Sequence, residues 1–360
     1  MSLSLNPPNT DTTKFKVAAV QAEPAWCDLQ GGVDKTIRII REASSEGAKI
    51  IGFPELFIPG YPWTLLANNF VAAQPIVKDY HANALSIHSP EMNRIQDAVH
   101  EADVTVVLGF AEHAGGSLYI AQVTITPDGK IANYRRKLKA THYEKTIFGD
   151  GNGKHVSPDL TVHHSSLLDQ SIYNVVQTPY GRLASLNCWE HIQPWFKTHM
   201  YSQYPQLFVA SWPAAFPPHT GGSPYSYSSE ACTRMSQFVA IEGGCFGLVA
   251  STVISEKGAE RMRLIGFPWF KFPGGGFSVV RPSLLFSINC CWTVMQIYGP
   301  DGSALTEPVD AGVEAIVYAD ISLDKIAENK IVTDIMGNYS RFDLLSTAVH
   351  GRKQVPCHLY

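Results

Sequence analysis

The sequence of 360 residues is poor in charge: Asp, Glu, Lys and Arg make up only 17%, and the formal net charge is −4. Phosphate backbones and anionic membrane surfaces attract clustered Lys and Arg, so neither a nucleic acid nor a membrane is an expected partner. No apolar run is long enough to cross a bilayer, and the start, MSLSLNPPNTDTTK, lacks the charged and apolar regions of a secretory leader. We therefore expect a cytoplasmic protein whose ligand is a small molecule.

Cysteine is also scarce, and its placement is irregular. The chain has seven cysteines, an odd number, and none of them form a C-x-x-C pair. This pattern argues against a disulfide framework and against a paired-cysteine zinc site. Reduced cysteines in a cytosolic chain are mostly small buried hydrophobes, so a special role for any of them has to be argued from its neighbours.

What the sequence has in abundance is short apolar runs, which predict strands. They cover residues 15–20, 48–53, 104–110, 119–126, 182–187, 206–212, 245–251 and 314–321. Helical patterns fill 31–48, 90–102 and 228–242, while TPDGK (126–130) and GPDGS (299–303) predict hairpin turns. The alternation predicts an α/β layer architecture with one catalytic domain, 15–322, between a flexible N-terminus, 1–14, and a C-terminal extension, 323–360.

Two of the predicted strands lead into residues that can do chemistry. The run AKIIGF leads to Glu55, followed by a stiff loop with Tyr61 and Trp63, and RLASLN leads to Cys188. Catalytic groups often stand where strands leave a sheet. In the basic stretch YRRKLK, strand alternation sends Lys137 to the opposite side from Arg136, so we expect this lysine to point into the fold.

Cys188 is followed by Trp189, Glu190 and His191 and precedes a turn. Backbone N–H groups at such a turn can favour a thiolate, which would make Cys188 a nucleophile. The Cys188–His191 spacing also fits half of a zinc site, but the sequence contains no second half. A buried structural cysteine is the third interpretation. Taken jointly, a thiol, an amine and a carboxylate form a complete set for acyl-type chemistry.

Three motifs occur in order: FPELFIPGYP around Glu55, RRKLKATHYEKTIFGDG around Lys137 and Glu144, and NCWEHIQP around Cys188. With them the chain resembles the nitrilase family of carbon–nitrogen hydrolases, from KVAAVQAEP to MGNYSRFDLL. The resemblance implies a four-layer α-β-β-α sandwich, Cys188 as nucleophile, Glu55 as general base, Lys137 as electrostatic and proton-donating partner, and Glu144 as a second acid beside the lysine. It also implies no metal or organic cofactor, and homo-oligomers built from dimers, often extended into spirals.

The segments IEGGCF (241–246) and PGGGF (273–277) are similar to the arylacetonitrile-hydrolysing branch. We therefore expect hydrolysis of an arylaliphatic or aliphatic nitrile to acid and ammonia through a thioimidate and a thioester, with some amide. Fungal cyanide hydratases are close relatives, in which we expect Asn in place of His191. The alternatives are the hydration of cyanide to formamide and an assembling protein on this fold whose active site is inactive. A papain-like cysteine protease is a third option, but it would need its own local sequence signature, and NCWEH is not that signature. The candidate substrate-binding residues are Tyr61, Trp63, Trp189, His191 and Trp212.

The C-terminal third holds a segment without a counterpart in the family pattern, the seventeen residues from Val280 to Gln296. Removing it would leave GGGFSVIYGPDG, which reads as one strand and turn. Its composition is too apolar for a solvated loop. We predict an insertion that is extra to the catalytic fold, either native or a retained non-coding segment.

Overall fold

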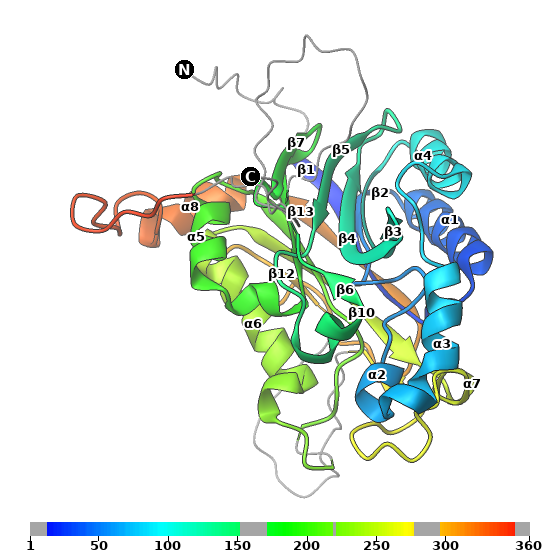
Figure 1. The fold of residues 1–360 in the computed structure, drawn as a ribbon. Helices are drawn as coiled ribbons and strands as arrows, with labels where there is room; N and C mark the ends of the chain where they lie inside the picture. The colour runs from blue at the N-terminus through cyan, green and yellow to red at the C-terminus, as the bar shows by residue number, and fades with distance from the viewer. Residues whose placement is uncertain (1–12, 152–170, 219–220, 277–295, 350–360) are drawn as a thin grey trace, which may run out of the picture.

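The computed structural model describes residues 13–151, 171–218, 221–276 and 296–349 (Figure 1). The strands in these ranges are β1 (Lys14–Ala22), β2 (Ala48–Gly52), β3 (Thr105–Ala114), β4 (Ser117–Ile125), β5 (Ile131–Arg136), β6 (Phe148–Gly149), β7 (Val175–Thr178), β8 (Gly181–Asn187), β9 (Leu207–Ser211), β10 (Phe246–Ile254), β11 (Gly274–Gly275), β12 (Ile297–Tyr298) and β13 (Ala315–Ser322). The helices are α1 (Leu29–Ser45), α2 (Thr64–Ala67), α3 (Phe70–Ala82), α4 (Pro90–Ala102), α5 (Pro194–Tyr201), α6 (Ser229–Gly243), α7 (Glu256–Arg261) and α8 (Asp324–Val332), with 3-10 turns η1 (His142–Thr146), η2 (Cys188–Ile192) and η3 (Tyr225–Tyr227). Each of the eight predicted strands is present, and α1, α4 and α6 are the three predicted helices.

The strands form two halves that meet at β1 and β10. The hydrogen-bonded order is β5-β4-β3-β2-β1 in the first half and β10-β9-β8-β7 in the second, with β13 added antiparallel to β1. Among the described residues, β1 and β10 join the halves through two residue pairs, Gln21 with Ser251 and Ala22 with Thr252. The predicted turn TPDGK joins the antiparallel strands β4 and β5.

Side chains alternate along these strands, so each half has an inner and an outer face. Val17 and Ile50 of the first half share one buried cluster with Leu183 and Val209 of the second, which fills the space between the halves. The halves approach closely at Gly52, where a Cβ would lie 2.7 Å from a methyl group of Val209.

Helices cover the two outer faces. Buried residues of α1 and α4 pack on the first half, and those of α5 and α6 pack on the second. Figure 1 shows the two helix pairs on opposite sides of the strands. The layer order is therefore the predicted α-β-β-α sandwich.

The two short strands β11 and β12 both pair antiparallel with β10, and they flank the predicted insertion. Gly275 lies opposite Val253, and Ile297 lies opposite Leu248. Five positions along β10 separate Val253 from Leu248, whereas twenty-two separate Gly275 from Ile297, a surplus of seventeen. The segment 280–296 itself lies outside the described residues except for Gln296, so its assignment as an insertion stays a prediction.

The two ends of the chain are described only in part. Residues 1–12 of the predicted flexible N-terminus lie outside the described ranges, and β1 already begins at Lys14. The predicted extension starts with α8 and then runs without helix or strand as far as residue 349. In the parts of the chain described here, none of the helices combines the length and the apolar character that a membrane span requires.

Candidate active site

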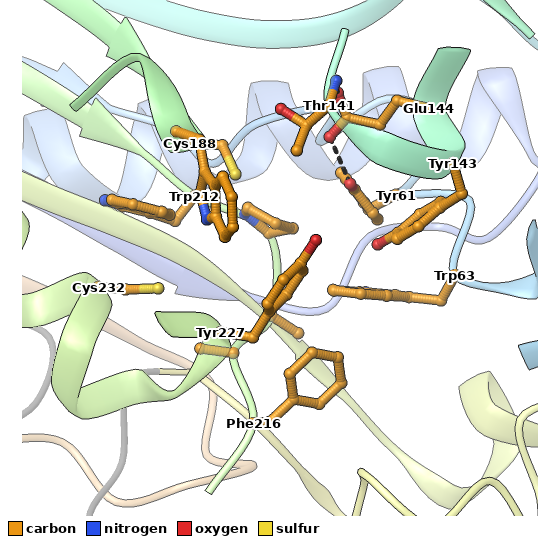
Figure 2. Close-up of a pocket in the computed structure, with 14 residues that line it drawn as sticks. Tyr61, Trp63, Thr141, Tyr143, Glu144, Cys188, Trp212, Phe216, Tyr227 and Cys232 are labelled. Carbon is orange, nitrogen blue, oxygen red and sulfur yellow. Dashed lines mark hydrogen bonds between the residues drawn. The ribbon is translucent and has the colours of Figure 1, made fainter. Parts of the chain in front are cut away.

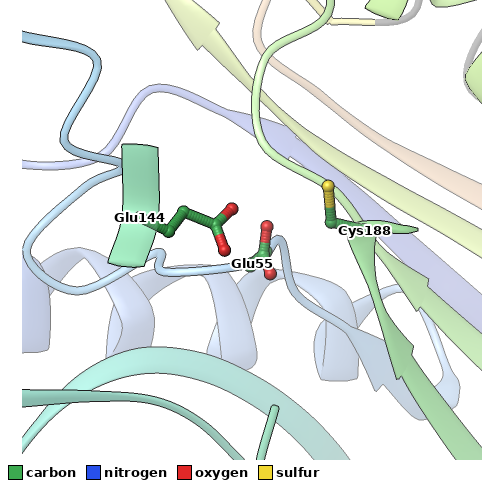
Figure 3. Close-up of side chains that lie close together, drawn as sticks. All are labelled: Glu55, Glu144 and Cys188. Carbon is green, nitrogen blue, oxygen red and sulfur yellow. The ribbon is translucent and has the colours of Figure 1, made fainter. Parts of the chain in front are cut away.

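The two predicted strand ends and the basic stretch around Lys137 meet in one buried cluster. Glu55 follows β2, Lys137 follows β5 directly, and Cys188 follows β8. The Lys137 Nζ atom is 2.9 Å from a carboxylate oxygen of Glu55 and 2.9 Å from one of Glu144, which η1 contributes. Figure 3 shows both carboxylates beside the Cys188 sulfur. One carboxylate oxygen of Glu55, one of Glu144 and the Cys188 Sγ atom all lie within 4.8 Å of one another.

The local backbone explains how the chain brings these groups together. Cys188 is the first residue of η2 and has a φ of 44°, in the left-handed region that side chains other than glycine rarely adopt. Such strained residues cluster at active sites, where the surroundings hold them. Under Glu55, β3 carries Gly109, where a Cβ would come within 2.4 Å of the Pro54 carbonyl oxygen. Only glycine leaves room for the turn that presents Glu55.

The two carboxylates have different surroundings. Glu144 accepts hydrogen bonds from the Tyr61 hydroxyl (2.5 Å), the Thr141 N–H (2.6 Å) and the Lys137 amine (2.9 Å). Glu55 has Lys137 as its ion-pair partner, and its oxygens have no well-aligned hydrogen bond among the described residues. Burial raises the pKa of Glu55 to about 8, and the neighbouring Glu144 charge adds to this rise while Lys137 opposes it. Glu55 is therefore suited to accept and return a proton near neutral pH.

The thiol and the amine respond differently to the same buried cluster. Burial raises the pKa of the Cys188 thiol well above its usual value, and the opposing effect of Lys137 does not outweigh it. The expected preformed thiolate is therefore not favoured, and the thiol needs a base. Burial alone would lower the pKa of Lys137, but Glu144 and Glu55 outweigh it, and the net direction is upward. Lys137 is thus held as an ammonium.

A metal site does not fit this arrangement well. Glu55, Glu144 and Cys188 are the metal-type ligands that come together in the described residues, but the Lys137 ammonium already lies between the two carboxylates. The zinc interpretation of Cys188 and His191 is not supported, because His191 Nδ1 is 2.5 Å from the Cys188 carbonyl oxygen instead. Burial lowers the pKa of His191 to about 3, so its ring is neutral.

A pocket opens beside the Cys188 sulfur (Figure 2). Its lining residues are Tyr61, Trp63, Thr141, Tyr143, Glu144, Cys188, Trp189, Trp212, Pro213, Ala214, Ala215, Phe216, Tyr227 and Cys232. The space that a water-sized sphere can occupy is about 20 Å³. A single water needs roughly 10–15 Å³ on this measure, so the free space suits a molecule of very few atoms.

Four of the five predicted substrate-binding residues line this pocket: Tyr61, Trp63, Trp189 and Trp212. His191 is not among the lining residues and stacks on Trp212, with ring centroids 4.6 Å apart. The sequence reasoning missed three aromatic residues, Tyr143, Phe216 and Tyr227.

The sequence gives a reason to propose one of these three residues but not the other two. Tyr143 directly precedes Glu144 in the motif RRKLKATHYEKTIFGDG, and this position could have suggested a place at the site. Phe216 and Tyr227 lie in an irregular segment between β9 and α6, where no helical or strand periodicity points to a pocket.

The chain belongs to the carbon–nitrogen hydrolase family, whose model matches residues 16–330. It is 65% identical over 357 residues to a cyanide hydratase of Armillaria gallica, covering 99% of this chain and 91% of that one. It is 44% identical over 338 residues to a nitrilase of Talaromyces marneffei, covering 93% and 95%. An arylacetonitrilase of Aspergillus kawachii is 40% identical over 343 residues, covering 94% and 93%.

Solved structures share the fold at low sequence identity. A carbon–nitrogen hydrolase from Helicobacter pylori G27 superposes with a TM-score of 0.62 at 16% identity, covering 89% of this chain and 93% of that one. An amidase variant from Nesterenkonia sp. AN1, with an acetamide moiety added to its active-site cysteine, gives a TM-score of 0.56 at 15% identity, covering 90% and 95%. These similarities confirm the α/β sandwich.

Proposed function

We propose that this protein converts nitriles through attack of Cys188 on the nitrile carbon, and that its preferred substrate is hydrogen cyanide, which it hydrates to formamide. The observation that carries the chemistry is the contact of Lys137 with both Glu55 and Glu144 beside the Cys188 sulfur. Two findings favour cyanide over the arylaliphatic nitriles expected from the sequence, although this chain has His191 at the position where we expect Asn in a cyanide hydratase. The free space at the sulfur is about 20 Å³, and a relative 65% identical to this chain is named as a cyanide hydratase.

The first step follows from the protonation states. Glu55 takes the proton of the Cys188 thiol, the sulfur bonds to the nitrile carbon, and one of the carbon–nitrogen bonds opens onto nitrogen. Lys137 donates a proton to that nitrogen and regains one from Glu55, 2.9 Å away. The product of this step is a neutral thioimidate.

Water then adds across the carbon–nitrogen double bond: Glu55 takes a proton from the water as its oxygen bonds to carbon, and Lys137 donates a proton to the nitrogen and regains one from Glu55. The tetrahedral intermediate carries a hydroxyl, an amino group and the Cys188 sulfur. If the carbon–sulfur bond breaks, the hydroxyl proton returns to the sulfur and the amide leaves. If the amino group is first protonated, ammonia leaves instead, and a second water hydrolyses the thioester to the acid. The proton supply through Lys137 and Glu144 therefore sets the ratio of amide to acid.

The test is a panel of hydrogen cyanide, propionitrile and phenylacetonitrile, with ammonia, acid and amide quantified for each. We expect formamide from cyanide as the main product of the fastest reaction. The Cys188→Ala variant should remain folded and convert none of them, because Cys188 is the thiol beside Glu55 and Glu144, whereas the other thiol of the pocket, Cys232, is not part of that group. Faster conversion of phenylacetonitrile than of cyanide would contradict the substrate, and an active Cys188→Ala enzyme would contradict the nucleophile.

We further propose a cytoplasmic homo-oligomer, built from dimers that extend into spirals. The support is the apolar surface of the C-terminal extension, where Tyr339, Leu344 and Leu345 are 74%, 66% and 78% exposed. Exposed apolar clusters of this kind mark interaction surfaces. Light scattering of the full chain and of a chain ending at residue 332 should show a smaller assembly for the shorter protein.

A further inference from the structure

A line of buried polar side chains runs beneath the active site. Ser211 Oγ donates to the Phe53 carbonyl oxygen (2.8 Å), and Gln122 Nε2 donates to Ser211 Oγ (2.8 Å). Arg135 Nη1 then donates to Gln122 Oε1 (3.1 Å). These three side chains are at most 1% exposed. The line thus begins two residues before Glu55 and crosses strands of both halves of the fold.

The line ends at Glu190, whose two carboxylate oxygens hold two pieces of backbone. One oxygen accepts a hydrogen bond from the Leu138 N–H (3.1 Å), and the other accepts one from the Asn187 N–H (2.9 Å). Leu138 directly follows Lys137, and Asn187 directly precedes Cys188. One buried carboxylate therefore joins the backbone beside the amine to the backbone beside the thiol.

The charge of this carboxylate is balanced by Arg135. Its Nη2 atom donates to Glu190 Oε1 at 2.5 Å, and both side chains are fully buried. Such a pair adds little stability over apolar side chains but is costly to break, because the remaining charge is left without a partner. The buried Arg135–Glu190 pair is therefore better explained by the need to hold the active-site backbone in place than by a gain in folding stability.

We propose that Glu190 is a positioning residue that holds the Lys137 amine and the Cys188 thiol at reacting distance through the two N–H groups beside them. The proposal rests on the proposed function only in taking Cys188 as the nucleophile. The left-handed backbone of Cys188 needs such support from its surroundings. Glutamine cannot replace the carboxylate, because its single carbonyl oxygen can serve one N–H group while its amide N–H₂ would face the other donor.

The arginine next to Arg135, Arg136, takes part in a second buried ion pair, which offers a matched control. Glu112 is also a buried carboxylate paired with an arginine: Arg136 Nε donates to it at 2.6 Å, and the Tyr134 hydroxyl donates at 2.5 Å. These partners are side chains of β5 and not the backbone of a catalytic turn. Glu112→Gln therefore disturbs a buried ion pair on the same strand without releasing Lys137 or Cys188.

The experiment measures the rate at which iodoacetamide alkylates Cys188 as a function of pH, and peptide mass spectrometry identifies the alkylated residue. The kcat and KM for cyanide are measured on the same variants. In Glu190→Gln, Lys137 moves away, the thiol pKa rises, and alkylation near pH 8 should slow about tenfold for each unit of that rise. We expect kcat to fall by a similar factor or more while KM changes little, and Glu112→Gln to resemble wild type in each measurement. Loss of the Glu190 charge alone would lower the thiol pKa and speed alkylation, so the direction separates positioning from charge.

Equal alkylation in the two variants, or faster alkylation in Glu190→Gln, would overturn the proposal. If Glu190→Gln does not fold, the double variant with Arg135→Gln removes both charges; it should fold and still alkylate slowly. Wild-type alkylation in the double variant, or its failure to fold, would show that the pair is structural only. If the wild-type protein converts no nitrile while the alkylation contrast holds, the proposed function fails and the positioning role stands.

Discussion

Glu55 makes a specific prediction about how stability depends on pH. Its pKa is raised from 4.5 to about 8 in the folded protein, chiefly by burial. Because the folded state binds this proton more tightly than the unfolded chain, the associated stability is present below about pH 4.5 and is lost as pH rises through about 8. One pKa unit corresponds to about 1.4 kcal/mol, so the loss over this window is at most about 5 kcal/mol.

The Glu55→Gln variant removes the titration and keeps the shape. We expect the free energy of unfolding of the variant, relative to wild type, to increase with pH between about 4.5 and 8, so that the variant is the more stable protein at pH 8. Its activity should fall about 100-fold or more, because the proposed general base is lost. Lys137 retains Glu144 as its partner, so the variant leaves no isolated buried charge.

Urea unfolding followed by tryptophan fluorescence at pH 5, 6, 7 and 8, at one protein concentration, measures this difference. Glu101→Gln is the control, because the Glu101 side chain is 63% exposed and should give a flat difference over the same range. A difference for Glu55→Gln that does not change with pH, or a wild type that is more stable at pH 8, would refute the reasoning.

Four further predictions concern the same enzyme. Lys137→Arg should lose nearly as much activity as Lys137→Ala, because guanidinium holds its proton too tightly to donate it; an active Lys137→Arg enzyme in the formamide assay would show that charge alone suffices. Glu144→Gln should lower the rate and shift the product of an organic nitrile towards amide; an unchanged ratio of amide to acid by chromatography would limit Glu144 to holding Lys137. Tyr61→Phe removes one hydrogen bond to a buried carboxylate, worth about 1.5–3 kcal/mol, so kcat should fall roughly 10- to 100-fold; a wild-type kcat would make Tyr61 a wall of the pocket only. Deletion of 280–296 should keep soluble expression and cyanide conversion; an insoluble protein, with the full chain as control, would place the segment inside the catalytic fold.

Much of the fold was predictable because its strands are short and strongly apolar. The two-residue period also placed Lys137 inside, on the opposite side from Arg136, and the structure confirms that Lys137 is buried. The same period would put Lys139 on the buried side as well, but β5 ends at Arg136, and Lys139 is exposed and pairs with Asp150. The helix α3 was missed because Pro75 lies inside it, and proline usually argues against a helix interior. The helix α5 was also missed; it begins at Pro194, and proline is favoured in the first turn of a helix.

The candidate site was predictable only in part, because motifs identify residues but not their partners. Nothing in the sequence pairs Arg135 with Glu190, fifty-five residues apart, since that contact depends on how β5 and β8 are placed in three dimensions. The raised pKa of Cys188 was likewise hidden, because it follows from burial between two carboxylates and not from the turn that the sequence indicates.

The division of the proposed catalytic residues between the two halves of the fold has a consequence for refolding. Glu55 and Lys137 follow strands of the first half, whereas Cys188 follows a strand of the second. The site is complete only when the two halves have docked. The recovery of enzymatic turnover therefore times the docking of the halves, while circular dichroism times the formation of their helices and strands.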